Sequence, residues 1–95
     1  MVSLDQSVEA TDAFASAEVD DERVLLNTER GEYYGLNPVG DRVLRIIEQK
    51  DHVSVRSIVD RLHADFPDVE YDSISEDVRS FIDDMEEYDL LLVHD

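Results

Sequence analysis

The 95-residue sequence predicts an α+β fold, in which a three-stranded antiparallel sheet is followed by three helices in a winged-helix-like arrangement. The first observation is that short stretches of strand-forming residues fall only in the first part of the chain, ending at residues 32–36. The second is that apolar residues at helical spacing fall only in the later part. The third is the pair Asn37-Pro38 between them, because asparagine followed by proline is typical of a helix start.

The predicted strands cover residues 13–19, 23–27 and 32–36. Residues 28–31 have the length of a hairpin connection and end in glycine. In the third strand, alternation places Tyr34 and Leu36 on one face of the sheet, with Tyr33 and Gly35 on the other. Residues 1–12 are polar and acidic without a clear period, so we expect a flexible tail before a single domain over residues 13–93.

Three helices are predicted. The first covers residues 38–49, and the second covers residues 55–65 with Ser54 as its N-cap. The third begins at a capping box formed by Ser73 and Glu76 and ends at about Tyr88. Each has an apolar stripe at helical spacing. The stripes are Val39, Val43, Ile46 and Ile47 in the first helix, Val55, Ile58, Val59 and Leu62 with Phe66 closing the end in the second, and Ile74, Val78, Phe81, Ile82 and Met85 in the third. The apolar run 90–93 fits either a final strand or a packed tail.

The charge balance limits the classes of partner. The chain has 25 acidic and 8 basic residues, a formal charge of −17, and it has no cysteine. Such a surface repels nucleic acid phosphates and anionic membranes, and no apolar run approaches the ~20 residues that span a bilayer. We therefore expect a cytoplasmic protein with neither nucleic acid nor membrane as a partner. The acidity is as consistent with a source of high internal salt as with an ordinary acidic protein.

No catalytic arrangement is visible in the sequence. His52, His63 and His94 lie far apart along the chain and are interpreted as exposed histidines, and the carboxylates spread over helix surfaces. The three glycines are not spaced to cradle a phosphate. We therefore expect no enzyme, no cofactor and no metal.

Binding of an extended peptide is the function that the residues favour. The third strand is expected at an edge of the sheet, because the chain leaves it directly for a helix, and a free edge can pair with another chain. Gly35 would let a second backbone approach closely. Tyr33 is as consistent with recognition as with packing, whereas for Tyr34, Phe81 and Met85 a place in the core is the better interpretation.

These residues also resemble a known family. The stretch 23–27, the stretch 31–37 with Gly40, and the acidic helix over residues 74–88 look like the PqqD family, which supplies precursor-peptide recognition elements in ribosomal peptide biosynthesis. The resemblance implies a non-enzymatic protein that holds a leader peptide along its third strand, beside its third helix. It also implies delivery of that leader to a modifying enzyme, such as a radical S-adenosylmethionine protein, a protease or a cyclase.

The resemblance further implies which residues contact the leader. They are Glu32, Tyr33, Tyr34, Gly35 and Leu36 on the strand, and Asp77, Val78, Phe81, Asp84 and Met85 on the helix. Two alternatives stay open at this point: a winged-helix DNA-binding regulator, and an enzyme subunit or toxin–antitoxin-like interaction protein. The acidic third helix argues against DNA, because a recognition helix needs basic residues.

Overall fold

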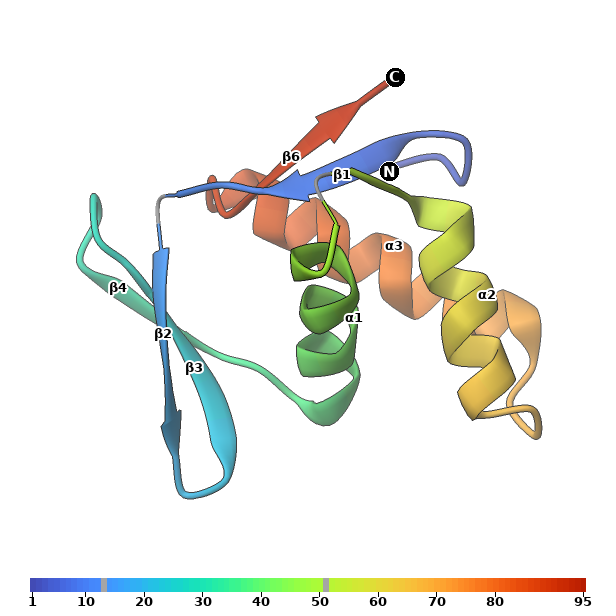
Figure 1. The fold of residues 1–95 in the computed structure, drawn as a ribbon, viewed down its shortest axis with the longest axis horizontal. Helices are drawn as coiled ribbons and strands as arrows, with labels where there is room; N and C mark the ends of the chain where they lie inside the picture. The colour runs from blue at the N-terminus through green and yellow to red at the C-terminus, as the bar shows by residue number, and fades with distance from the viewer. Residues whose placement is uncertain (13, 51) are drawn as a thin grey trace.

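The computed structural model describes residues 1–12, 14–50 and 52–95, and it confirms the α+β class. Residue 13 of the predicted first strand and residue 51 of the predicted loop lie outside the described part. In chain order the elements are β1 (Ser7–Ala10), β2 (Phe14–Val19), β3 (Glu22–Asn27), β4 (Glu32–Gly35), α1 (Pro38–Glu48), β5 (Val53–Ser54), α2 (Val55–Asp65), α3 (Tyr71–Glu87) and β6 (Leu91–His94). Figure 1 shows α1 at the centre, with one sheet to its left and another above it.

The predicted three-stranded sheet is present. Its strands are antiparallel in the order β2-β3-β4, so β4 lies at a free edge as expected. The side of β3 that faces the helices carries Arg23, Leu25 and Asn27, which are buried. The opposite side carries Val24 and Leu26, which stay partly exposed.

A second sheet, in the order β5-β1-β6, corrects two expectations. Residues 1–12 are not a detached tail: β1 is the central strand of this sheet, and Val2 and Val8 belong to the core. The predicted loop before α2 contributes β5. Of the two alternatives for the apolar run 90–93, a final strand or a packed tail, the strand is confirmed as part of β6. The periodicity of β1 was undetectable because Val8 is its one fully buried residue, among polar neighbours.

The helices follow the apolar stripes closely. The Asn37 side chain accepts a hydrogen bond from the Gly40 N–H (2.7 Å), and Ser54 Oγ accepts one from the Ser57 N–H (3.1 Å), so both predicted N-caps are confirmed. Val39 and Phe66 were expected to face inward, but they are 40% and 49% exposed, because each lies at a helix end beyond the core.

The start of α3 differs from the prediction. The helix begins two residues before Ser73, with Glu70 as an N-cap that makes no side-chain capping hydrogen bond. Tertiary contacts of Tyr71 support this earlier start. Its hydroxyl donates to Asp60 Oδ1 (2.8 Å), and its ring meets His63 edge-on. Packing against α2 thus replaces the capping box.

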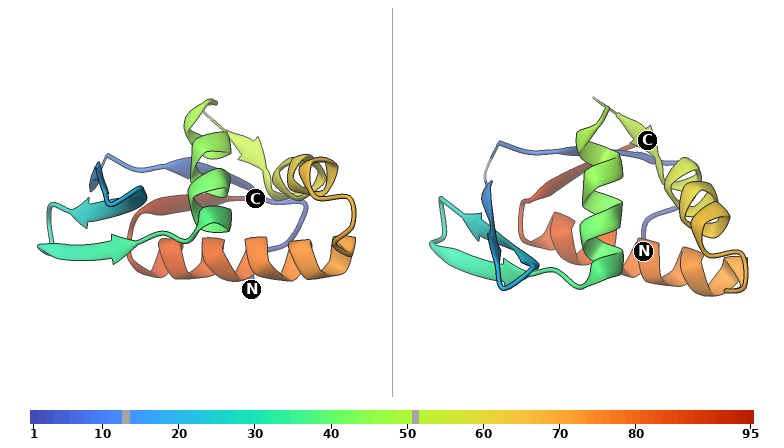
Figure 2. Two further views of the ribbon diagram at one scale, coloured as in Figure 1. Left: turned by 90° about the horizontal axis from the view of Figure 1, so that it is seen from below. Right: turned by 60° about the horizontal axis from the view of Figure 1, so that its bottom comes forward.

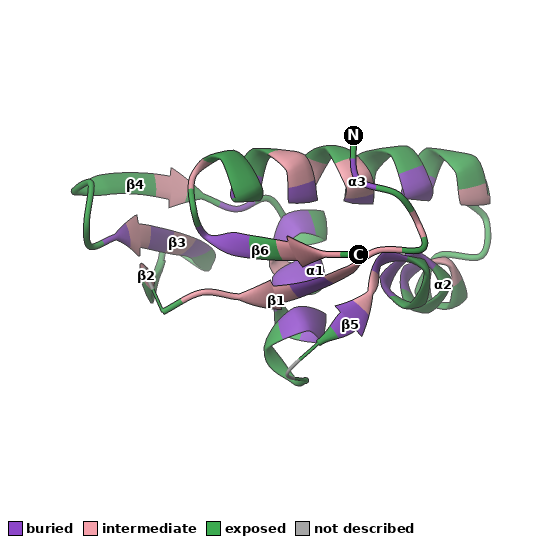
Figure 3. Cartoon of the chain, turned by 90° about the horizontal axis from the view of Figure 1, so that it is seen from above, coloured by how far each residue is buried: buried purple, intermediate pink, exposed green. Residues whose placement is uncertain are grey.

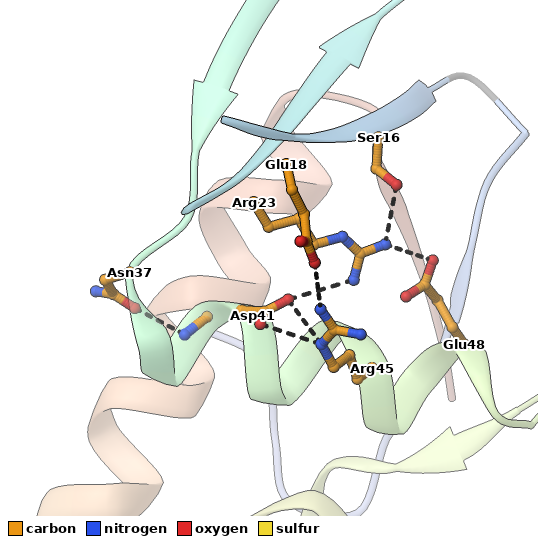
Figure 4. Close-up of polar contacts among 8 residues, drawn as sticks. Ser16, Glu18, Arg23, Asn37, Asp41, Arg45 and Glu48 are labelled. Atoms are coloured by element: carbon orange, nitrogen blue, oxygen red, sulfur yellow. Dashed lines mark hydrogen bonds and ion pairs between the residues drawn. The ribbon is translucent and has the colours of Figure 1, made fainter. Parts of the chain in front are cut away.

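A buried arginine joins the β2-β3-β4 sheet to α1 (Figure 4). Arg23 is 9% exposed and contacts Glu48 Oε2 at 2.8 Å, Asp41 Oδ1 at 3.5 Å and Ser16 Oγ at 3.4 Å. The hydrogen bond to Glu48 is the main cause that raises the pKa of Arg23. Arg45 approaches the same Asp41 at 3.1 Å. The network holds β3 against α1, and so sets where β4 leads into that helix.

None of the helices in the described part of the chain is long and apolar enough to cross a membrane.

Candidate functional site

The free edge of β4 presents unpaired main-chain groups. The Leu36 N–H donates to the Arg23 carbonyl across the ladder (2.9 Å). Hydrogen-bonded and non-hydrogen-bonded positions alternate along an antiparallel pair, so Gly35 and Tyr33 occupy positions that do not bond to β3. Their N–H and C=O groups therefore point away from the sheet. An extended chain lying along β4 would meet two donors and two acceptors there.

The side chains along this edge leave it open. Tyr33 is 73% exposed, and Glu32 and Gly35 are exposed. A Cβ atom added at Gly35 would meet nothing within 4 Å, so no described part of the chain covers the face of the sheet at this residue. Leu36, in contrast, is buried in the core.

A hollow lies between α1 and α3, and the segment that follows β4 reaches it at Asn37. Its volume is about 320 Å³, and its lining residues are Asn37, Val39, Gly40, Asp77, Ser80, Phe81 and Asp84. Figure 2 shows how β4 runs into α1 at the level of α3. The wall from α3 combines the Phe81 ring with two exposed carboxylates, at Asp77 and Asp84. The hollow thus combines apolar surface from Val39 and Phe81 with negative charge.

Three contacts join the β3–β4 hairpin to the end of α3. Asn27, fully buried, donates from Nδ2 to the Tyr88 carbonyl (3.0 Å), and its Oδ1 accepts from the turn N–H groups of residues 29 and 30. Arg30 pairs with Asp89 (2.7 Å). The Tyr34 ring stacks on Tyr88, with centroids 4.4 Å apart. These contacts set the position of β4 relative to α3.

Tyr34 has a structural role, as the alternation of side chains along the strand predicted. Its ring is partly buried against the core, and among the described residues none makes a hydrogen bond to its buried hydroxyl. Desolvation raises the pKa of Tyr34, and the negative charge of Glu32 adds to this effect. Of the two tyrosines on β4, Tyr33 is therefore the one that faces the solvent.

The structure divides the predicted α3 residues into two groups. Asp77, Phe81 and Asp84 line the hollow, whereas Val78 and Met85 are buried in the core. Sequence reasoning did not assign Asn37, Val39, Gly40 or Ser80 to the site. A glycine in the first turn of α1 was the available signal, because the packing of α1 on α3 explains it: a Cβ at Gly40 would lie 2.8 Å from Phe81 Cε1.

Gly40→Ala is therefore expected to displace the Phe81 ring into the hollow. Phe81 is half-buried and borders the hollow, so we expect a loss of stability near the lower end of the roughly 1–3 kcal/mol that overpacking costs. Thermal melting measures this loss. The control is a double-mutant cycle with Phe81→Leu. The effects of the two substitutions on the free energy of unfolding should not be additive, and strictly additive effects would contradict the contact between residue 40 and Phe81.

Fold and site together define a class of protein. It is a small α+β domain that has a free sheet edge and a hollow lined by two helices. A free edge of this kind can take an extended segment as an added strand. A family model described as coenzyme PQQ synthesis protein D (PqqD) matches residues 22–91, and the chain belongs to this family. None of the curated proteins matches it.

Two solved structures share the fold. The first, "TbiB1 in Complex with the TbiA(beta) Leader Peptide", has 34% sequence identity and a TM-score of 0.76, covering 87% of this chain and 93% of that one. The second, "Lasso peptide synthetase B1 complexed with the leader peptide", has 20% identity and a TM-score of 0.77, covering 90% and 96%. The second similarity shows the fold alone.

Proposed function

We propose that this protein is a non-catalytic accessory that holds the leader of a ribosomally made precursor peptide as an added strand along β4. The free N–H and C=O groups of Tyr33 and Gly35 carry this proposal, because they can pair with any extended backbone. The structure of TbiB1, which is 34% identical and in complex with a leader peptide, supports it.

Side-chain recognition would come from the hollow beside the strand. Phe81 offers an apolar surface, and Asp77 and Asp84 offer negative charge. We therefore expect a leader with an apolar anchor and one or two basic residues. With about 1 kcal/mol per hydrogen bond, less the cost of ordering a flexible peptide, the expected Kd is micromolar or somewhat tighter.

The bound leader would be presented to a modifying enzyme, of the radical S-adenosylmethionine, protease or cyclase type. We place this step in the cytoplasm, where ribosomes make the precursor. A short open reading frame beside a gene for such an enzyme would identify the cognate peptide.

The direct test is calorimetric titration with two synthetic leaders: the one encoded beside this gene, and the TbiA(beta) leader that TbiB1 binds. We expect 1:1 binding of the neighbouring leader, with amide NMR shifts largest at Tyr33 and Gly35. Raising the salt concentration should weaken binding modestly, because screening reduces the attraction to acidic residues. Binding with no shifts on β4 would overturn the edge-strand proposal.

The DNA-binding alternative receives no support from the comparisons, and the acidic α3 argues against it. A gel shift with random duplex DNA tests it directly. A shifted duplex, together with no binding of either leader, would replace the peptide proposal by the DNA one.

A further inference from the structure

The outer face of the β5-β1-β6 sheet carries a cluster of three side chains of the types that bind metal ions. None of the three lines the hollow between α1 and α3. Figure 3 shows β1 between β6 and β5 in this sheet. Val8 pairs with Val53 and Val93 and points into the core, so its neighbour Glu9 points outward. His94 lies on the same outward side of β6, and His52 immediately precedes β5, opposite Glu9.

The donor atoms of these three residues converge. His94 Nε2 lies 2.8 Å from Glu9 Oε1, His52 Nε2 lies 3.3 Å from Glu9 Oε2, and all three ligand atoms lie within 4.8 Å of one another. The two imidazole rings are stacked, with centroids 4.8 Å apart. Ligands at about 2.0–2.2 Å from a tetrahedral Zn²⁺ are separated by roughly 3.3 Å, so only small side-chain movements would bring an ion into contact with all three.

We propose that Glu9, His52 and His94 form a Zn²⁺ site with one coordination position open. Two imidazole nitrogens and one carboxylate are a donor set that favours zinc and related transition ions over Mg²⁺ or Ca²⁺, which prefer oxygen ligands. The three side chains are 30–56% exposed, so an ion can reach them and a water molecule can complete the tetrahedron.

The ligands come from distant parts of the chain, and this gives the ion a structural effect. It would tie β1 near the N-terminus to β6 near the C-terminus and to the segment before α2. Glu9 and His94 lie outside residues 22–91, the part that the family model matches, so the site is a feature of this chain rather than of the matched segment.

The test is a zinc titration of the full chain after removal of metal by chelation, in competition with a chromogenic zinc indicator. Millimolar Mg²⁺ is present to occupy the other carboxylates of this acidic protein. We expect one Zn²⁺ per chain with micromolar or tighter affinity, and a rise in Tm of roughly 5–10 °C at saturating zinc. Both His52→Gln and His94→Gln should weaken zinc binding at least tenfold.

His63→Gln is the matched control, because His63 is the only other histidine and lies on α2, against Tyr71. It should bind zinc as the unchanged protein does. Melting curves without metal check that each variant is folded, and cobalt spectra of the folded variants report histidine coordination. Equal zinc affinity in all three variants, or the absence of a 1:1 stoichiometry, would overturn the site. Leader binding is measured separately and is expected to be unaffected by zinc.

Discussion

Gly35→Pro is expected to weaken leader binding by roughly 10- to 100-fold while leaving the domain folded. The Gly35 N–H faces the free edge of β4 rather than β3, so its removal costs the sheet no ladder hydrogen bond. The proline ring would stand where the backbone of the bound leader must approach, and the main-chain donor would be lost. Calorimetric titration measures the affinity, and a thermal melt checks the fold.

Glu18→Pro is the matched control on the opposite edge of the same sheet. The same alternation directs the N–H of Glu18, on β2, away from β3. This variant should bind the leader as tightly as the unchanged protein. Equal loss of binding in both variants would mean that proline disturbs the sheet as a whole. Normal binding by a folded Gly35→Pro variant would exclude β4 as the pairing strand.

Asn27→Ala is expected to give the largest loss of stability, about 2–4 kcal/mol, which corresponds to a fall in Tm of roughly 10–20 °C. Asn27 is fully buried and makes three hydrogen bonds, two within the β3–β4 turn and one to the Tyr88 carbonyl at the end of α3. Alanine removes all three and leaves the Tyr88 carbonyl without this partner. Denaturant or thermal unfolding measures the effect.

Arg30→Gln serves as the control for the same corner. The Arg30–Asp89 ion pair also joins the turn to the end of α3, but its side chains are 43% and 64% exposed, and pairs of this kind contribute about 0–1 kcal/mol. Leader affinity, measured well below the melting temperature, should fall more in Asn27→Ala than in Arg30→Gln. A small and equal change in both would mean that water replaces the Asn27 hydrogen bonds.

The features of the proposed site that depend on local pattern could be predicted from the sequence. Tyr33 and Gly35 follow from strand alternation, and the edge position of β4 follows from the helix start at Asn37. Phe81 and Val78 occupy the same apolar stripe, so the pattern could not tell which of them lines a hollow and which is buried. The structure separates them, because the position of α1 over α3 leaves room beside Phe81 at Gly40.

The three helices, the β2-β3-β4 sheet and its free strand could be predicted from the sequence, because they depend on periodicity, turn length and capping residues. The second sheet, the start of α3, and the meeting of Glu9, His52 and His94 follow from contacts between elements, which the sequence pattern does not show. The start of α3 depends on Tyr71, which packs against α2, and the other two depend on the pairing of β1. A strand as short as β1, with its one fully buried valine, is stabilised by partners more than 40 residues away in the sequence. Such pairings depend on the packing of the helices beneath them, which no local pattern records.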